Sequence, residues 1–280
     1  MIQIDAHQHF WNPARGDYGW MDPANATLYR PYAPDDLRPH LSRHGIDKTV
    51  LVQAAPTVEE SAYMLGLADA TPFVAGVVGW INFENPDDEA ILAQFAQHPK
   101  FVGVRPMIQD IEDDNWMLRE DIAWAYKAIA KHDLCFDALG FPRHLANFHT
   151  ILTRHSEMRC VIDHCMKPQI HAHSAETFQV WADGMAALAR DTKAYLKFSA
   201  LVTEANEGWT IEDLRPYADH VFACFGADRI MWGSDWPVCR LRAEYDAWRH
   251  AAEELTKTLS AEERARVFGG TAAEAYRLAL

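Results

Sequence analysis

The chain has 280 residues, of which 49% are hydrophobic and 24% are charged, and its formal net charge is -14. These values are ordinary for a globular enzyme, and the length suits a single α/β barrel of typically about 250 residues. Because no basic run interrupts the acidic balance, and neutralising phosphates requires clustered Lys and Arg, the composition predicts no nucleic-acid binding.

The cysteine count and the hydropathy exclude two further classes. Five cysteines without a CxxC pair argue against a disulfide framework and against a structural zinc knuckle. No apolar run approaches the roughly 20 residues that span a membrane, so no membrane partner is expected. The chain opens on a strand without a basic and apolar leader, and we therefore expect a cytoplasmic protein.

Residues 3–11 read as the first strand, and chemistry gathers at its end. Side chains alternate along a strand, so His7 and His9 are expected on one face, where two imidazoles can share one divalent metal. An ordinary surface strand end is the competing interpretation for this pair alone. The segment 12–34 that follows carries aromatic residues without periodicity, including Trp20 and Tyr32. A loop of this length is typical of a lid or a binding wall, and a packed surface loop is the alternative.

Seven more apolar runs suit buried strands, at 49–53, 73–82, 101–107, 134–141, 160–165, 194–201 and 230–236. Helical segments separate them, with starts indicated by Thr57 and Glu60, by Asn85 before a proline, and by Ser260 and Glu263. Eight strands alternating with helices predict an α/β fold, a (β/α)8 barrel in which 1–280 form one domain. A doubly wound open sheet is the rival, but no glycine-rich turn of the dinucleotide-binding type follows the first strand.

Catalytic groups of such barrels lie at the carboxyl ends of the strands. Polar residues recur there in this sequence: His7 and His9, Arg105, Asp163 and His164, Lys197 and Ser199, and Asp235. This recurrence favours a functional site over isolated surface residues.

Four ordered motifs carry a resemblance to a known family: 5–11 (DAHQHFW), 102–105 (VGVR), 162–168 (IDHCMKP) and 232–237 (WGSDWP). With these motifs the chain resembles the amidohydrolase superfamily, in the branch of metal-dependent-hydrolase-like proteins that contains sugar lactonases. The resemblance covers nearly the whole chain. It implies that His7 and His9 are metal ligands or their relics, that His164 is a further ligand or polarises a carbonyl, and that Asp235 is the catalytic carboxylate.

The sequence departs from the binuclear members of that superfamily. Those members supply a bridging Lys or Glu from the fourth strand and a histidine from the fifth, whereas this chain has Arg105 and no histidine at 136–140. We therefore expect at most one divalent metal. A set of His7, His9, His164 and Asp235 suits zinc best, and whether the metal is required is left open.

Two of these residues have structural alternatives. Asp235 follows a Gly-Ser turn, and its structural alternative is to cap the next helix. Its place between two tryptophans instead favours proton transfer, because apolar walls raise the pKa of a carboxyl group. Arg105 either forms a structural ion pair or holds a substrate oxygen. Lys197 and Ser199 are interpreted as supporting or packing residues.

The resulting hypothesis is hydrolysis of a sugar-acid lactone of the fucono-, galactono- or rhamnonolactone type. Asp235 would accept a proton from water, the three histidines with or without one metal would polarise the carbonyl, and Arg105 would position the ring together with Trp20, Tyr32 and Trp236. The alternatives are a lactonase for pyrone dicarboxylates or muconolactone, a metal-dependent decarboxylase, and a binding barrel without activity. A dicarboxylate would require further cations, for which Arg143, Arg240 and Arg242 are candidates. The oligomeric state is not predicted.

Overall fold

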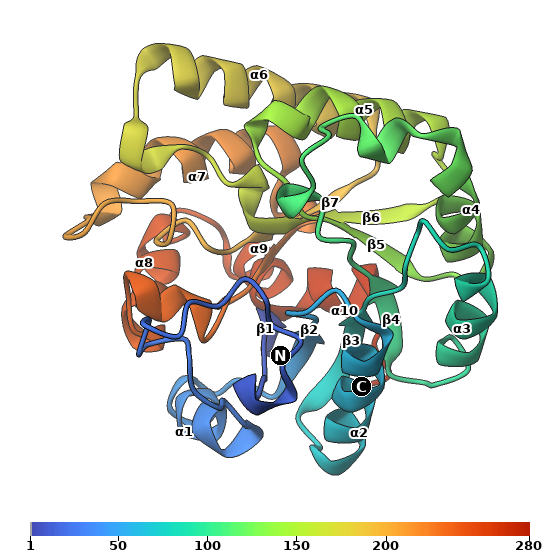
Figure 1. The fold of residues 1–280 in the computed structure, drawn as a ribbon. Helices are drawn as coiled ribbons and strands as arrows, with labels where there is room; N and C mark the ends of the chain where they lie inside the picture. Colours follow the sequence, from blue (N-terminus) through green and yellow to red (C-terminus); the bar gives the residue numbers. More distant parts are fainter. Residues whose placement is uncertain (1) are drawn as a thin grey trace.

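A computed structural model describes residues 2–280, and its centre is one sheet of eight parallel strands in the sequential order β1 to β8 (Figure 1). The strands are β1 (Ile4–Gln8), β2 (Lys48–Val52), β3 (Val74–Gly79), β4 (Phe101–Val104), β5 (Cys135–Ala138), β6 (Arg159–Ile162), β7 (Tyr195–Phe198) and β8 (Ile230–Trp232). In a doubly wound sheet the first strand lies inside the strand order. Here it lies at one end of the order, and the open-sheet alternative is therefore wrong.

Main-chain hydrogen bonds join the first strand to the segment that follows the last one. The N–H of His9 donates to the carbonyl of Trp236 at 2.7 Å, and the N–H of Asp235 donates to the carbonyl of His7 at 2.8 Å. The buried carboxylate of Asp5 accepts the N–H of Ser234 at 2.8 Å. These contacts close the sheet, and the predicted single-domain (β/α)8 barrel is confirmed.

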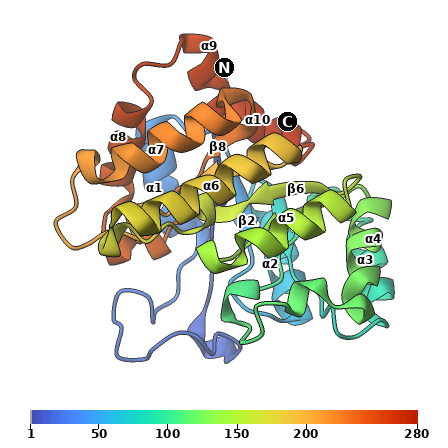
Figure 2. The same ribbon diagram turned by 90° about the horizontal axis from the view of Figure 1, so that it is seen from above.

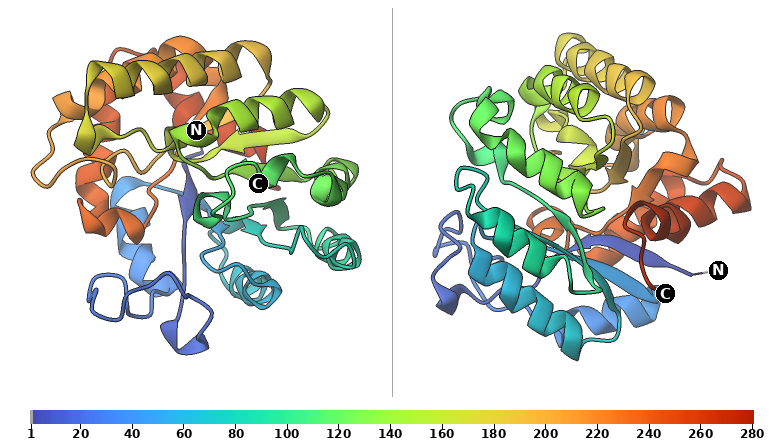
Figure 3. Two further views of the ribbon diagram at one scale, coloured as in Figure 1. Left: turned by 45° about the horizontal axis from the view of Figure 1, so that its top comes forward. Right: turned by 90° about the vertical axis from the view of Figure 1, so that its right-hand side faces the viewer.

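Helices surround the sheet on all sides in Figures 1 and 3. They are α1 (Pro34–His44), α2 (Val58–Ala70), α3 (Asp88–Phe95), α4 (Ala123–Lys131), α5 (Leu145–Arg154), α6 (Ala175–Asp191), α7 (Ile211–Phe225), α8 (Tyr245–Leu255), α9 (Ala261–Ala265) and α10 (Thr271–Ala275). Each long helix buries an apolar stripe against the strands, as Trp181 and Met185 do in α6 and Trp248 does in α8. In the part of the chain that is described, no helix has the length and apolar character needed to cross a membrane.

The strands are shorter than predicted at their carboxyl ends. The strand predicted at 73–82 ends at Gly79 in the structure, and the strand predicted at 230–236 ends at Trp232. Beyond those points Ile81 is buried in a loop, and Trp236 is buried with only an isolated bridge to Gln8 of β1. Burial alone produced the apolar signal there, and burial does not distinguish a strand from a packed loop.

The helix starts are partly as predicted. Ser260 and Glu263 form the expected reciprocal cap, with each side chain accepting the other residue's N–H. Thr57 caps α2 through its hydroxyl, but the carboxylate of Glu60 accepts the N–H groups of the preceding loop instead. Asn85 does not begin a helix, because α3 starts at Asp88.

The segment between β1 and α1 lies at the end of the barrel opposite the two chain ends, as Figure 2 shows. It is folded back by mutual main-chain hydrogen bonds between Trp11 and Tyr32, at 3.1 and 2.9 Å. A short helical turn at Pro13–Arg15 is its regular element. The segment is therefore a packed loop whose base is fixed beside the carboxyl end of β1.

Candidate active site

A cavity of about 140 Å³ opens at the carboxyl ends of the strands. Its polar lining includes His9, Arg105, His164 and Asp235, which come from or follow β1, β4, β6 and β8. The four segments are far apart in sequence, and the barrel brings them together because parallel strands all end at the same rim. The predicted convergence of strand-end residues is observed.

His7, His9 and Asp235 form a close triangle at the floor of this cavity. The Nε2 atoms of the two histidines lie 3.1 Å apart, and Asp235 Oδ1 lies 3.3 Å from His9 Nε2 and 3.6 Å from His7 Nε2. The Nδ1 of His9 is 2.7 Å from the carbonyl of Val52. A carbonyl only accepts, so Nδ1 of His9 carries the proton and the Nε2 lone pair points toward the triangle.

His164 enters the cavity from a left-handed turn. The 3-10 segment Asp163–Met166 follows β6 directly, and φ is positive at four successive residues from His164 (54°) to Lys167 (47°). Such angles cost about 1–2 kcal/mol for each residue that is not glycine. The turn places His164 Nε2 3.9 Å from Asp235 Oδ1, and its Nδ1 contacts the hydroxyl of Ser199 at 2.8 Å. Asp235 itself has a φ of 55°, so unfavourable backbone is concentrated at this site.

Arg105 makes a buried ion pair, which was one of its two predicted roles. Its Nη1 donates to Asp163 Oδ2 at 3.0 Å, and its Nη2 donates to the side-chain oxygen of Gln53 at 3.1 Å. Gln53 returns a hydrogen bond from Nε2 to the carbonyl of Arg105 at 2.8 Å. The guanidinium is thereby fixed while it still lines the cavity, and the two predicted roles are compatible.

Below the cavity, Lys197 occupies the centre of a fully buried charge cluster. Its Nζ donates to Asp137 Oδ2 at 2.6 Å, lies 2.9 Å from Asp163 Oδ1, and contacts His7 Nδ1 at 3.0 Å. The hydroxyl of Tyr276 donates to the same oxygen of Asp137 at 2.7 Å. Although burial alone would raise it, the pKa of Asp163 is held well below its usual range by the ammonium of Lys197.

The three histidines are neutral in this environment. Burial, followed by the charge of Lys197, holds the pKa of His7 well below its usual range, and burial lowers the pKa of His164 to about 3. Burial also lowers the pKa of His9. Neutral imidazoles suit both metal binding and polarisation of a carbonyl.

The expected rise in the pKa of Asp235 is wrong. Burial by itself raises the pKa of this carboxyl group, but the neighbouring imidazoles of His164 and His9 outweigh burial and hold it below the ordinary value. The imidazoles of His9 and His164 lie 3.3 and 3.9 Å from the carboxylate, and they lower its pKa more than burial raises it. Asp235 also caps no helix, because the 3-10 turn Val238–Leu241 that follows has Pro237 at its N-cap and α8 begins only at Tyr245.

The donor atoms of the triangle fit a single divalent metal. Zinc bonds of 2.0–2.1 Å in a tetrahedron place neighbouring ligand atoms roughly 3.3 Å apart, close to the 3.1, 3.3 and 3.6 Å observed between His7, His9 and Asp235. His7, Asp163 and His164 form a second group close enough to hold an ion. Lys197 Nζ, which can only donate, lies 3.0 Å from His7 Nδ1, so without an ion the proton of His7 is on Nε2. An ion at Nε2 would require this proton to move to Nδ1, which faces Asp163 Oδ1 at 3.6 Å.

Of the three aromatic residues expected to hold the substrate ring, one lines the cavity and two do not. Trp20 lines the cavity, and its indole N–H donates to the carbonyl of Ala54 at 2.6 Å. The loop that carries Ala54 is fixed by the buried carboxylate of Glu60, whose pKa burial raises to about 7. Tyr32 and Trp236 pack edge to face on each other, with ring centroids 5.1 Å apart, and neither is among the residues that line the cavity.

The sequence interpretation gave no role to Gln109 and Asp137, and it gave Lys197 only a supporting role. Gln109 and Lys167 line the cavity together, with Lys167 Nζ donating to Gln109 Oε1 at 2.6 Å. The sequence could have indicated the pair Asp137 and Lys197, because opposite charges inside two buried strands require each other as partners. The loop histidines 171 and 173 contact Glu204 and Tyr217 respectively and do not line the cavity.

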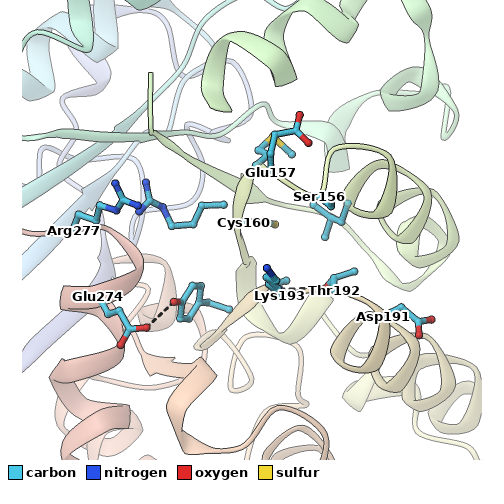
Figure 4. Close-up of a pocket in the computed structure, with 13 residues that line it drawn as sticks. Ser156, Glu157, Cys160, Asp191, Thr192, Lys193, Glu274 and Arg277 are labelled. Atoms are coloured by element: carbon cyan, nitrogen blue, oxygen red, sulfur yellow. Dashed lines mark hydrogen bonds between the residues drawn. The ribbon is translucent and has the colours of Figure 1, made fainter. Parts of the chain in front are cut away.

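A larger hollow, of about 620 Å³, lies at the other end of β6 and β7 (Figure 4). Arg159 and Arg277 in its lining pair with Asp133 outside it. Glu274 pairs with Arg266 and accepts the hydroxyl of Tyr195 at 2.9 Å. Burial raises the pKa of the Cys160 thiol in its wall well above the usual range, so this thiol is not a nucleophile. The hollow lacks the convergent histidine and carboxylate groups of the smaller cavity.

The barrel and the strand-end histidines and aspartate define a hydrolase-like class of site, and comparison with known proteins agrees. A family model described as amidohydrolase matches residues 4–278, and the chain belongs to this family. It is 42% identical to an L-fucono-1,5-lactonase of Burkholderia ambifaria over 99% of this chain and 96% of that protein. An L-fucono-1,5-lactonase of Burkholderia multivorans is 33% identical over the same shares. A crystal structure of an amidohydrolase from Burkholderia multivorans with bound zinc superposes with a TM-score of 0.94 at 34% identity, covering 100% of both chains.

Proposed function

We propose that this protein hydrolyses the lactone of a neutral sugar acid, of the fucono-1,5-lactone class, to the free aldonic acid. The observation that carries the proposal is the carboxylate of Asp235 held among three neutral imidazoles at the floor of a small cavity. The names of the two Burkholderia relatives support the reaction class and the sugar.

Asp235 is the general base in this proposal. Its lowered pKa keeps it ionised at neutral pH, so it can accept a proton from a water molecule in the cavity. The water oxygen forms a bond to the lactone carbonyl carbon, and the bond from that carbon to the ring oxygen then breaks. The departing ring oxygen takes the proton back from Asp235, so that one water is added and no other group is consumed.

The histidines and Arg105 stabilise and orient the reacting ring. His164 is fixed by Ser199 and directs Nε2 into the cavity, where it can hydrogen-bond the carbonyl oxygen as negative charge develops there. Arg105 is held by Asp163 and Gln53 and presents the guanidinium to ring oxygens. Trp20 covers the apolar side of the ring.

His7, His9 and Asp235 would hold a divalent metal, with zinc favoured by the donor set and by the zinc-bound neighbour. When bound, such an ion supplies Lewis-acid polarisation of the carbonyl and a lower pKa for water. The residues would then keep the geometry described above, with the His9 tautomer set by Val52.

The cations near the cavity favour a neutral ring over a dicarboxylate. Arg143 is paired with Asp114 and Arg240 with Glu244, and neither these residues nor Arg242 line the cavity. Arg105 and Lys167 are its two cationic lining residues, and Arg105 is neutralised by Asp163.

A pH-indicator assay tests the proposal, because opening any lactone releases a proton. Purified protein is offered neutral sugar lactones and dicarboxylate lactones, each with and without a chelator. Rapid acid release from the sugar lactones is expected, and its loss with chelator would assign the histidines to a required metal. Selective turnover of dicarboxylates would move the function to that class. No acid release from either class of lactone would contradict lactone hydrolysis. Release of carbon dioxide from an aromatic acid would then identify a decarboxylase.

A further inference from the structure

A second hollow, of about 550 Å³, adjoins the catalytic cavity on the side of β3 and β4. Trp20 and Met107 line both hollows, so the two share a wall. Most of the second hollow is built by the loops that follow β3 and β4, and Asp17, Gly19 and Pro56 from the loops after β1 and β2 complete it. We call it the aromatic groove and define it by the residues Trp20, Trp80, Asn82, Phe83, Asp110 and Trp116.

The aromatic rings of this groove are held in place before any ligand arrives. Phe83 and Trp116 are buried and stack with their centroids 5.8 Å apart at an interplanar angle of 30°. The indole N–H of Trp116 donates to Glu84 at 3.1 Å, and that of Trp20 donates to Ala54 at 2.6 Å. Rigid aromatic faces next to a reaction site lose little entropy on binding, and they favour a flat ligand whose C–H groups can pack on them.

The groove also offers unused polar groups. Within residues 2–280, neither the indole N–H of Trp80 nor the side-chain amide N–H of Asn82 makes a hydrogen bond, and both residues are half-buried. The exposed carboxylate of Asp110 supplies an acceptor on the opposite loop. Donors and an acceptor around aromatic faces suit a ring that carries hydroxyl groups, because each hydroxyl both donates and accepts.

The charges of the groove exclude an anion. Asp17, Glu84 and Asp110 line it, and among its described lining residues there is no Lys or Arg. A cation is also disfavoured, since Arg15 pairs with Asp17 at 2.6 Å and Arg119 pairs with Glu84 at 2.5 Å. The occupant that complements this lining is neutral.

We infer that the aromatic groove is a subsite for a neutral sugar ring attached to the lactone, so that the enzyme accepts lactones of disaccharide acids. The inference rests on the proposed function. The catalytic cavity of about 140 Å³ accommodates one small ring, and it is smaller than the roughly 300–1,000 Å³ usual for ligand pockets. With the groove, the combined site falls within that range.

The test compares two substrates, a monosaccharide 1,5-lactone and the 1,5-lactone of a neutral disaccharide oxidised at its reducing end. Trp80→Leu removes a half-buried ring of the groove, and Ile111→Trp fills the groove without removing a core side chain. Trp209→Leu is the matched control, because Trp209 is also half-buried but is not among the lining residues of the groove.

Wild-type kcat/KM for the disaccharide lactone should equal or exceed that for the monosaccharide lactone. Each groove variant should lower kcat/KM for the disaccharide lactone about tenfold and change kcat/KM for the monosaccharide lactone less than about twofold. The control Trp209→Leu should not show this selective loss on the disaccharide lactone. Wild-type hydrolysis of the monosaccharide lactone alone, or an equal loss on both substrates in the groove variants, would overturn the subsite and leave the proposed function standing.

If wild type hydrolyses neither lactone, the proposed function fails, and binding decides the groove separately. The wild-type protein is then titrated with the disaccharide lactone while tryptophan fluorescence is recorded. A saturable change that Trp80→Leu abolishes and Trp209→Leu retains would support the groove as a sugar site. An unchanged signal would overturn it.

Discussion

The main-chain N–H of Asp235 donates to the carbonyl of His7 across the seam between the first and last strands, at 2.8 Å. This one bond sets the carboxylate of Asp235 beside the imidazoles of His7 and His9 and also closes the barrel. The site and the fold thus depend on the same contact. Exchanging the side chain of Asp235 leaves this main-chain bond in place, so the role of the carboxylate can be tested in a folded protein.

Asp235→Asn should lower kcat on the sugar lactone about 10²–10⁴-fold, because the amide cannot accept the proton of water. Asparagine tolerates the positive φ of 55° found at this position, so the variant should fold. Steady-state assays give the loss, and fluorescence titration should still detect substrate binding. Retention of more than a tenth of the activity would show that another group is the base.

Ser199→Ala should lower kcat by about tenfold to a hundredfold by releasing the ring of His164, whose Nδ1 it contacts at 2.8 Å. KM should change less than kcat, since Ser199 is fully buried and does not line the cavity. Ser260→Ala is the control: it removes a helix cap and should cost stability of about 1 kcal/mol without changing kcat. Equal kinetics in Ser199→Ala and wild type would remove Ser199 from the mechanism.

Lys197→Met should destabilise the fold by about 3–5 kcal/mol, because Asp137 and Asp163 are left buried without their cation. Urea unfolding measures the loss of unfolding free energy. Lys257→Met removes an exposed ion pair with Glu254 and should change stability by less than about 0.5 kcal/mol. A comparably small effect at Lys197 would mean that the cluster relaxes or admits water.

Glu60→Gln should make the protein less sensitive to pH. The folded state binds the proton of Glu60 more tightly than the unfolded state, since burial raises the pKa from 4.5 to about 7. Raising the pH between these values therefore lowers the unfolding free energy of wild type relative to the variant, by up to about 3 kcal/mol. The glutamine oxygen can still accept the N–H groups of Ala54 and Ala55. Urea unfolding at pH 5 and pH 8 measures the difference, and a gap that does not widen with pH would contradict this account.

His9→Ala should abolish tight zinc binding, because His9 Nε2 presents its lone pair between His7 and Asp235. The expected loss exceeds the roughly hundredfold seen when only an outer partner of a ligand is removed. Isothermal titration calorimetry with zinc, after treatment with chelator, gives the affinity. His44→Ala is the control, since its ring pairs with Asp246 on the outer helices. Equal affinities in both variants would place the ion elsewhere.

The fold could be predicted from the sequence because its pattern repeats. Eight apolar runs separated by amphipathic helices leave few arrangements, and a sheet in sequential order closes into a barrel. The limits of the strands could not be predicted, since Ile81 is as deeply buried in a loop as its neighbours are in β3.

The convergence of the candidate site residues could be predicted where they lie at the carboxyl ends of strands. His7, His9, His164 and Asp235 meet because parallel strands end at one rim. The placement of Trp236 could not be predicted: it follows Asp235 directly, in a turn that directs the carboxylate toward the histidines and the indole toward Tyr32. The lowered pKa of Asp235 likewise depends on distances to imidazoles that no spacing in the sequence discloses.

At the left-handed residues of the candidate active site, backbone stability and the proposed activity favour different amino acids. His164 and Asp235 have φ values of 54° and 55°, angles that glycine adopts without strain. Glycine at either position would relieve the strain and would remove a side chain to which we assign a catalytic role. If selection acted on the stability of the protein but no longer on its activity, glycine would be favoured at these two positions. Activity would then be lost while stability increased. A library sorted for thermal stability alone should therefore be enriched in inactive proteins.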